Sequence, residues 1–379
     1  MEHTQHPAPG DDRYADVVVA GAGLAGLVAA VTAARAGGRV ALLDVRSPGG
    51  RATSQVRDGF VLNQGPHALY ARGPGAAVLR GLGVTTAGAP PHPVGAGAVG
   101  ERVGLLPTSA GTLLRSPLVG PRAKVRLAAL LARFARIDTP ALAPLSAAGW
   151  VRSLGLPADG ATLLATLLRV ATYASDLEAV SADAAVRQLQ LVLAGGVTYL
   201  HGGWSSLVDQ LVAGAARAGV ELVPDTRALA LAPTSDGGWE LATSAAPWRA
   251  RAVVLALGGP EATRAVLPAD PDWQLGADAT AACLDLGLSR VPPTPLLFAL
   301  DEPLYLSTHA PSARLAPEGR ALVHVLRYGA RTSEEDRPRL WRFAAQAGIR
   351  SDDVVVERFL HRMTVSHGLP VPGPGLAGR

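Results

Sequence analysis

Three glycines and one acidic residue near the start of the chain have the types and spacing of a nucleotide-binding site. Gly21, Gly23 and Gly26 form a GxGxxG pattern, and Asp44 follows the last of them by 18 residues. In such a site the glycines permit a tight turn, a close approach of the backbone to a pyrophosphate, and close packing of a helix on a strand. The acid accepts hydrogen bonds from ribose hydroxyls and disfavours a 2′-phosphate. The pattern predicts a dinucleotide site formed by Gly21, Gly23, Leu24, Ala25, Gly26 and Asp44.

The residues around these glycines predict the elements that position them. Residues 16–20 are a β-branched run typical of a buried strand, residues 24–36 are alanine-rich and helical in character, and residues 39–43 form a second apolar run. Gly37 and Gly38 are suited to end the helix. The start of that helix would offer free amides and partial positive charge to phosphates. The segment therefore predicts a strand–turn–helix–strand unit of an α/β protein.

The segment after Asp44 separates a flavin from a nicotinamide dinucleotide. It contains GGRA at residues 49–52 and GPH at residues 65–67. With these motifs the chain resembles the flavoprotein superfamily of phytoene desaturases, protoporphyrinogen oxidases and flavin amine oxidases. Two details depart from the family pattern, because the spacer after Asp44 is shorter than usual and Asn63 stands where an acid is common. The resemblance implies FAD as the cofactor, with further contacts from Arg46, Gly49, Gly50, Arg51, Ala52, Gly65, Pro66, His67 and Ala228.

The resemblance also implies how the chain is divided. A Rossmann-like FAD-binding domain with a parallel sheet is expected from residues 16–75 and 199–275. A discontinuous α+β substrate domain is expected from residues 76–198 and 276–379, with a helical lid and a sheet. Residues 1–15 are expected to form a disordered tail.

Periodicity and turn residues give a coarse map of the other elements. Residues 73–120 are rich in glycine and proline, which predicts loops with short strands. Helices are predicted at residues 150–154, 161–173, 182–193 and 205–218, the last capped by Ser205 or Ser206. Strands are predicted at residues 226–233, 238–244, 248–259, 296–306 and 321–328.

Other reactive residue types form no recognisable catalytic or metal-binding pattern. The sequence lacks HExxH, HxH and Ser/His/Asp signatures, and its only cysteine, Cys283, lies in an apolar run as a small buried residue. We therefore expect no metal site and assign no catalytic residue. The only lysine, Lys124, falls on the predicted lid and not where flavin amine oxidases commonly carry one, which disfavours amine oxidation. Packing or surface placement is favoured over catalysis for four polar residues assigned to the predicted second sheet, Tyr305, His309, His324 and Tyr328.

These observations lead to one expected function and two alternatives. We expect an FAD-dependent oxidoreductase that removes a hydride from an apolar substrate such as an isoprenoid or a tetrapyrrole-like compound. Oxygen or a quinone-like compound would accept the electrons, and no nucleic-acid partner is expected. A redox-neutral FAD-dependent isomerase and a truncated, non-catalytic flavoprotein remain open. The truncated flavoprotein remains open because family members continue past the segment LPVPGPGLAGR into a final strand with a Gly-Asp motif. We therefore expect the chain to be a fragment that lacks the last flavin-binding segment.

Membrane association is a separate question. The polar N-terminus lacks the apolar core of a signal peptide, which predicts a cytoplasmic protein. Residues 17–34 carry no charge over a length that suits a membrane span, but their glycines favour a strand, a turn and a helix. A basic amphipathic lid helix could lie on the inner face of a membrane, and an ordinary packed lid helix is the favoured alternative. The residues concerned are Arg122, Arg126, Arg133 and Arg136 on one side and Leu127, Leu130, Leu131 and Phe134 on the flank.

Overall fold

The computed structural model describes residues 13–107 and 109–373, and its contacts divide the chain into two compact α/β units. The first unit consists of the chain up to Thr53, Val78–Thr86 and Trp204–Trp273. The second consists of Ser54–Ala77, Ala87–Gly203 and the chain from Gln274 onward. The division into an FAD-binding and a substrate domain at the expected boundaries stays a prediction. The expected tail lies outside the described residues as far as residue 12, and the first strand already begins at Arg13.

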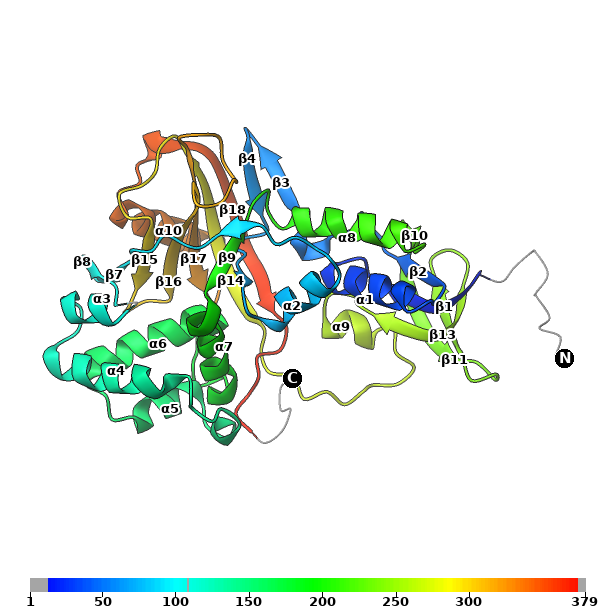
Figure 1. The fold of residues 1–379 in the computed structure, drawn as a ribbon, viewed down its shortest axis with the longest axis horizontal. Coiled ribbons are helices and arrows are strands. Elements are labelled where there is room, and N and C mark those ends of the chain that lie inside the picture. The colour runs from blue at the N-terminus through cyan, green and yellow to red at the C-terminus, as the bar shows by residue number, and fades with distance from the viewer. Residues whose placement is uncertain (1–12, 108, 374–379) are drawn as a thin grey trace. The chain divides into compact units, whose positions relative to one another are not determined.

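The first unit is built on a sheet with the strand order β10-β2-β1-β13-β12-β11 (Figure 1). Strands β10, β2, β1 and β13 pair in parallel, and β12 and β11 continue the sheet antiparallel. The central strands are apolar on both faces, as parallel strands covered on two sides must be. The bounds are β1 Arg13–Ala20, β2 Val40–Leu43, β10 Glu221–Val223, β11 Ala228–Pro233, β12 Trp239–Thr243 and β13 Trp248–Leu255.

Two helices of this unit pack against each other beside the sheet, α1 (Leu24–Arg35) and α8 (Ser205–Arg217) (Figure 1). The predicted strand–turn–helix–strand unit is confirmed, and Gly37, with φ +92°, releases the chain after α1. The predicted cap of α8 is wrong. Its N-cap residue is Trp204 and no side chain caps the helix, because Ser205 already lies in the first turn. A short helix, α9 (Pro260–Arg264), follows β13.

The second unit contains a sheet with the order β18-β14-β17-β16-β15-β7-β8. The strand predicted at residues 321–328 is confirmed as β17. The one predicted at residues 296–306 is wrong, because Asp301, Glu302 and Pro303 form a turn that splits it into the antiparallel pair β15 and β16. The bounds are β7 Ala96–Val99, β8 Arg102–Leu105, β14 Ala279–Leu288, β15 Leu296–Ala299, β16 Leu304–Ala310, β17 Ala321–Tyr328 and β18 Val354–Ser366.

One face of this sheet is apolar and is covered by α10 (Ser333–Gln346). Leu284 and Val323 of the sheet form a core with Leu340 and Phe343 of the helix. The helix begins where the Thr332 hydroxyl accepts a hydrogen bond from the Glu335 amide. The opposite face of the sheet carries polar side chains and is described with the site.

The segment between β8 and β9 adds a group of helices to the second unit. The three predicted helices of this segment are confirmed as α5, α6 and α7. Residues 73–120 are more ordered than predicted, because they include the helices α2 and α3 as well as short strands. The bounds are α2 Pro74–Gly81, α3 Ala110–Arg115, α4 Pro121–Phe134, α5 Ala147–Ser153, α6 Ala158–Thr172 and α7 Ala182–Gly195. The short strands are β3 Ser54–Arg57, β4 Phe60–Asn63, β5 Leu69–Tyr70, β6 Gly88–Ala89 and β9 Val197–Leu200, and the 3₁₀ turns are Gly50–Ala52, Pro140–Leu142 and Ser351–Asp353.

The apolar side of the basic helix α4 is used for packing. Leu127, Leu130 and Phe134 are buried, whereas Leu131 is exposed. Among the described residues, no helix combines the length and the hydropathy needed to cross a membrane. The uncharged run of residues 17–34 is divided between β1, the glycine turn and α1.

Candidate functional site

The turn between β1 and α1 needs the first and the third glycine of the GxGxxG pattern for steric reasons. Gly21 has φ +104°, and a Cβ on it would lie 2.2 Å from the carbonyl oxygen of Ala256. A Cβ on Gly26 would lie 1.8 Å from the carbonyl oxygen of Gly21. No side chain can fit at these distances, so both glycines are required by the fold itself.

Gly23, the middle glycine, faces open space. A Cβ built on it has no atom within 4 Å, and its φ of −67° is one that other residues adopt readily. It is also the N-cap of α1, whose N-terminus has no side-chain cap. The amides of Leu24, Ala25 and Gly26 lie in the first helical turn, where no carbonyl of the helix can accept from them. This combination fits a phosphate group that approaches the backbone at Gly23.

The GGRA segment lies against this turn, within the same unit. The Gly49 amide donates to the carbonyl of Ala22 at 2.8 Å, and Gly23 and Gly49 form an isolated parallel bridge. Gly50, with φ +53°, is close enough that its Cβ would lie 3.4 Å from Gly23 Cα. Arg51 and Ala52 follow in a 3₁₀ turn, with Arg51 exposed and Ala52 buried. The structure thus brings together the two glycine motifs that the sequence analysis assigned to the cofactor.

Asp44 directly follows β2 and is fixed by backbone amides. Its Oδ2 accepts from the Ala22 amide at 2.6 Å and its Oδ1 from the Arg46 amide at 2.9 Å. Each carboxylate oxygen keeps a further lone pair that can accept from a ribose hydroxyl. Thr226 donates its amide to the Asp44 carbonyl at 2.9 Å, which brings the start of β11, with Ala228, to the same edge of the sheet.

The remaining residues implied for the cofactor, Gly65, Pro66 and His67, belong to the second unit. His67 Nδ1 lies 3.1 Å from the Gly65 carbonyl oxygen, and the Tyr173 hydroxyl donates to the Pro66 carbonyl at 3.4 Å. A Cβ on Gly65 would lie 2.7 Å from the sulfur of Met363 on β18. The implied cofactor residues are therefore distributed over both units.

The same unit contains a row of polar side chains that crosses four neighbouring strands of its sheet. Arg358 on β18 stands opposite Asp285 on β14, Asp285 opposite His324 on β17, and His324 opposite Ser307 on β16. Residues directly opposite each other in antiparallel strands project to the same face. We call Arg358, Asp285, His324 and Ser307 the polar row.

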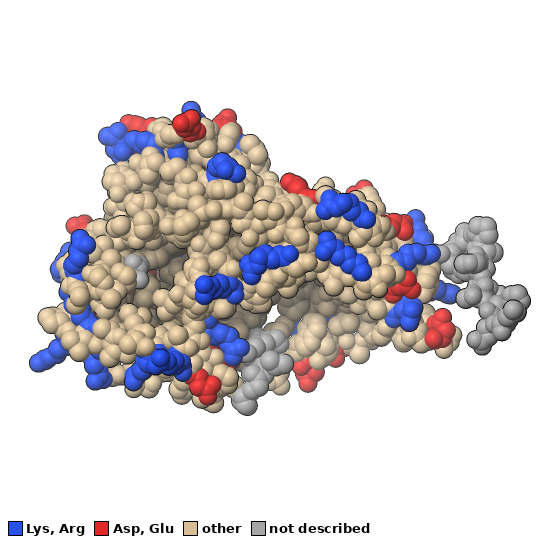
Figure 2. Space-filling view, viewed as in Figure 1, with Lys and Arg blue, Asp and Glu red and all other residues tan. Residues whose placement is uncertain are grey.

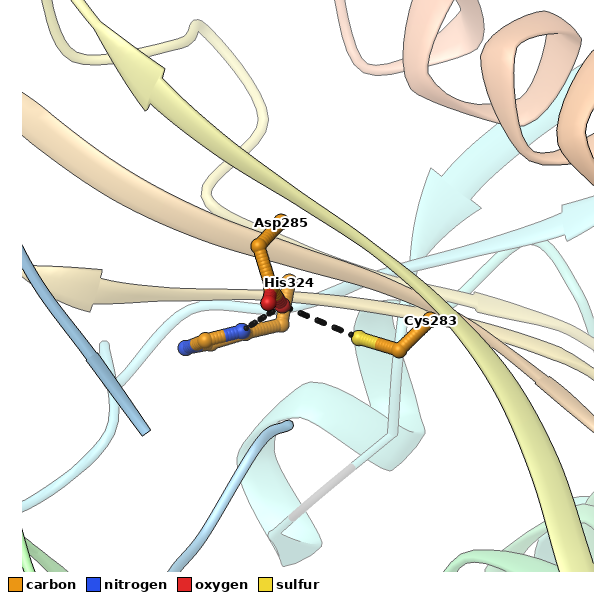
Figure 3. A group of neighbouring side chains, drawn as sticks. All are labelled: Cys283, Asp285 and His324. Atoms are coloured by element: carbon orange, nitrogen blue, oxygen red, sulfur yellow. Dashed lines mark hydrogen bonds and ion pairs between the residues drawn. The ribbon is translucent and has the colours of Figure 1, made fainter. Parts of the chain in front are cut away.

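Asp285 is the centre of the polar row, and Figure 3 shows its contacts with His324 and Cys283. His324 Nδ1 lies 2.6 Å from its Oδ1 and the Cys283 thiol 3.1 Å from the same oxygen. Arg358 reaches Oδ2 with Nε at 2.8 Å and Nη2 at 2.5 Å, and it also donates to the carbonyl of Asn63. Burial alone would raise the pKa of Asp285, but His324 and Arg358 bring the pKa below its ordinary value. Asp285 is therefore a buried carboxylate.

Cys283, Asp285 and His324 place potential metal-ligand atoms within 4.8 Å of one another, a group that the sequence analysis did not foresee. Two features disfavour an ion here. The guanidinium of Arg358 already neutralises the carboxylate, and burial, followed by the charge of Asp285, raises the pKa of Cys283 well above its usual range. Because thiols bind metals as thiolates, the group is better described as a hydrogen-bonded cluster around Asp285.

Aromatic side chains surround the polar row on the same face. The His309 ring stacks on Tyr199 with centroids 3.5 Å apart and meets His324 edge-on at 4.4 Å. Tyr328 meets Tyr173 edge-on at 5.4 Å. The four polar residues that the sequence analysis expected to pack or to lie on the surface, Tyr305, His309, His324 and Tyr328, are all buried on this one face.

Three buried polar atoms on this face have no hydrogen-bond partner in the described part of the chain. They are His324 Nε2, His309 Nδ1 and the Tyr328 hydroxyl. Such atoms are rare in folded proteins, because leaving a buried polar group unpaired costs about 1–3 kcal/mol. Asp285 and Arg358, which organise the face, were missed in the sequence. The only local signal was the spacing of Cys283 and Asp285 by two residues in an apolar run, which puts both on one face of a strand.

Replacing His309 by phenylalanine is expected to reduce the loss of stability in mild acid. Burial, with smaller contributions from His324 and His67, holds the pKa of His309 well below its usual range. The unfolded chain therefore takes up a proton at His309 from about pH 6.5 downward, while the folded protein does not. Over that window His309 lowers the free energy of unfolding by about 1.4 kcal/mol for each pH unit of acidification.

Urea denaturation between pH 7 and pH 5 measures this slope in the parent and in His309→Phe. The exposed His92 provides the control, because His92→Phe should keep the parent's pH dependence. An equal slope in the parent and in His309→Phe would contradict the assignment.

Comparisons with known proteins give one family match and several solved structures with a similar fold. The profile of a family described as "FAD dependent oxidoreductase" matches residues 16–275. No curated protein sequence matches the chain.

Solved structures with a similar fold cover nearly the whole chain. An oxidoreductase from Methanosarcina mazei has a TM-score of 0.72 at 16% identity, covering 91% of this chain and 87% of that one. A protein proposed to be a protoporphyrinogen oxidase, from Exiguobacterium sp. 255-15, has a TM-score of 0.71 at 18% identity, covering 96% and 89%. Cyclohexylamine oxidase from Brevibacterium oxydans IH-35A has a TM-score of 0.70 at 16% identity, covering 95% and 88%. At these identities the likeness concerns the fold.

Proposed function

Because this chain belongs to the FAD dependent oxidoreductase family, we propose that it oxidises a carbon–hydrogen bond of a largely apolar small molecule. The observation that carries the proposal is the open space at Gly23, at the uncapped start of α1 and beside the fixed carboxylate of Asp44. A side chain at Gly23 would fill the space that a pyrophosphate needs. The donors and acceptors present therefore fit FAD.

FAD supplies the hydride acceptor when it is bound, and the chain's own residues have the other tasks. The backbone at Gly23 and the first-turn amides of α1 would hold the pyrophosphate, with Gly50 and Arg51 next to them. Asp44 would hold the adenosine ribose. In the second unit, Leu326 and Phe298 belong to a buried apolar cluster on the face of the polar row, and such surroundings suit a substrate that is mainly hydrocarbon and keep water away from it.

Replacing Gly23 by alanine is expected to lower the affinity for FAD by about tenfold or more while the fold is kept. The added methyl meets no protein atom but occupies the position from which a phosphate oxygen would accept a backbone hydrogen bond, and each lost charge-assisted bond is worth about 1.5–3 kcal/mol. Titration of the apoprotein with FAD, followed by flavin fluorescence, measures the affinity.

Thermal unfolding of the apoprotein provides the control for this variant, since parent and Gly23→Ala should melt together. Equal FAD affinity in the two proteins, or no bound flavin in either, would count against the proposed cofactor site.

Reduction of an acceptor dye during turnover distinguishes net oxidation from the isomerase alternative, which forms product without consuming the dye. Oxygen or a quinone-like compound is the proposed physiological acceptor.

A cytoplasmic location and membrane contact through Arg122, Arg126, Arg133 and Arg136 stay predictions. The packing of Leu127, Leu130 and Phe134 supports an ordinary lid helix, because a bilayer needs those side chains to be free. Figure 2 shows the basic side chains of one face dispersed, with several over the region of α4 and α5 and few acidic ones among them. Co-sedimentation with anionic and neutral liposomes, comparing the parent with Arg126→Glu/Arg133→Glu, tests the contact.

A further inference from the structure

One arginine of the second unit is half-buried without an acidic partner. Arg169 lies on α6, its Nε is buried, and no described residue accepts a hydrogen bond from its side chain. We propose that Arg169 binds the carboxylate of the substrate. The inference rests on the proposed function, and it narrows the substrate class from a largely apolar molecule to one that carries a single carboxylate group.

The charge of Arg169 is not compensated by the described part of the chain. Burial lowers the pKa of Arg169, and the contribution that opposes this comes from Tyr328. Tyr328 supplies no negative charge at neutral pH, because its own burial raises the pKa of the phenol well above the usual range. Arginine side chains that lose water normally pair with a carboxylate, since burying an unpaired cation is costly. An anion from outside the chain would provide the missing partner.

The position of Arg169 on α6 shows how a ligand can reach it. Leu163 belongs to the apolar cluster on the face of the polar row, whereas Leu168 packs with α5 and α7. At about 100° per residue, Arg169 falls between these two sides, in line with the exposed Thr162. The terminal nitrogens of its guanidinium have no partner among the described residues and are not buried. They are therefore accessible beside the apolar cluster.

One helical turn further along the same side of α6 lies a side chain that contacts the turn at residues 65–67. Tyr173 follows Arg169 by four residues and ends α6 in a left-handed conformation, with φ +57°, where glycine is the usual residue. Its side chain explains the choice, because the ring meets Tyr328 edge-on at 5.4 Å and the hydroxyl donates to the Pro66 carbonyl at 3.4 Å. Arg169 therefore lies close to the segment that the family resemblance sets beside the flavin.

A carboxylate suits Arg169 better than other charged groups do. Two parallel N–H groups of a guanidinium can donate to the two oxygens of one carboxylate, and the two charges cancel. A phosphate group carries nearly two negative charges at neutral pH, and no second cation acts on Arg169. An ammonium group would be repelled. The neighbouring cluster, with Leu163 and Leu326, is apolar and suits the hydrocarbon part of the ligand.

Four probes that share a cyclohexane ring test the proposal on the full, FAD-reconstituted chain. They are cyclohexanecarboxylate, cyclohexanecarboxamide, cyclohexylphosphonate and cyclohexylamine, and equilibrium dialysis at pH 7 measures their binding without turnover. The carboxylate should bind about tenfold more tightly than the amide of the same shape, because only the carboxylate forms an ion pair. Equal binding of these two, tighter binding of the phosphonate or the amine, or binding of no probe would overturn the proposal.

Substitutions at Arg169 separate recognition from folding. In Arg169→Met the preference for the carboxylate over the amide should fall to about one. The melting temperature should equal or exceed that of the parent, because the variant removes an unpaired charge. Arg133→Met, at an exposed position on α4, should bind the probes as the parent does. An unchanged preference in Arg169→Met would reject the assigned contact.

Arg169→Lys provides the conservative variant, since it keeps the charge and should retain part of the preference. If Arg169→Met melted below the parent, this variant would decide, and loss of its preference would reject the site. Because dialysis requires no turnover and FAD affinity is measured separately through Gly23→Ala, a missing carboxylate site is distinguishable from a wrong cofactor.

Discussion

Replacing Arg358 by methionine is expected to lower the free energy of unfolding by about 3–5 kcal/mol. The substitution keeps most of the side-chain volume but leaves the buried carboxylate of Asp285 without the guanidinium that neutralises it, and it removes the same guanidinium from the Asn63 carbonyl. An uncompensated buried charge is among the most costly single changes in a protein. Urea denaturation at pH 7 measures the difference.

A second substitution tests whether the lost charge balance is the cause. Arg358→Met/Asp285→Leu removes both charges and should recover more than half of the loss, because a neutral pair needs no compensation. Arg337, which pairs with Glu357 at an exposed position, gives the matched control, and Arg337→Met should change stability far less. A loss below about 1 kcal/mol in Arg358→Met, or no recovery in the double variant, would contradict the role given to this ion pair.

Replacing Gly26 by alanine is expected to cost about 3 kcal/mol or more, the upper range of overpacking effects. The new Cβ would lie 1.8 Å from a backbone oxygen, so α1 must move away from the turn at Gly21. The same movement should abolish FAD binding. Thermal unfolding and flavin fluorescence measure the two consequences.

Gly111 provides the comparison for Gly26, because it lies in α3 and a Cβ on it meets nothing within 4 Å. Gly111→Ala should leave stability unchanged or raise it slightly, since alanine favours helices over glycine by up to about 1 kcal/mol. If Gly26→Ala were as harmless as Gly111→Ala, the close packing of α1 on the turn would be wrong.

The arrangement of the residues assigned to the cofactor was predictable because its information is local. Gly21, Gly23, Gly26 and Asp44 lie within one strand–turn–helix–strand unit, where residue spacing alone determines their relative positions. The helix predicted at residues 24–36 agrees with α1, Leu24–Arg35. Of the other local predictions, the N-cap of α8 was wrong.

The polar row could not be predicted because it depends on strand register between distant segments. Asp285 and His324 are 39 residues apart, and Asp285 and Arg358 are 73 apart. Asp285 is the one charged residue of β14, and Arg358 and His324 share their strands with other polar residues, so the sequence carries no sign of which residues meet. The turn at Asp301 and Pro303 was also not predicted, so β15 and β16 were expected to form one strand. The position of His309 beside His324 therefore could not be predicted either.

The polar row also constrains how the second sheet can form. If β14 slipped by one residue, its side chains would exchange faces, and Asp285 would enter the hydrocarbon layer that Leu340 and Phe343 of α10 build. The same slip would carry Leu284 and Leu286 toward Arg358 and His324. A misaligned pairing of β14 would therefore cost free energy on both faces of the sheet. The hydrogen-bonded cluster around Asp285 therefore also favours the native strand register while the sheet forms.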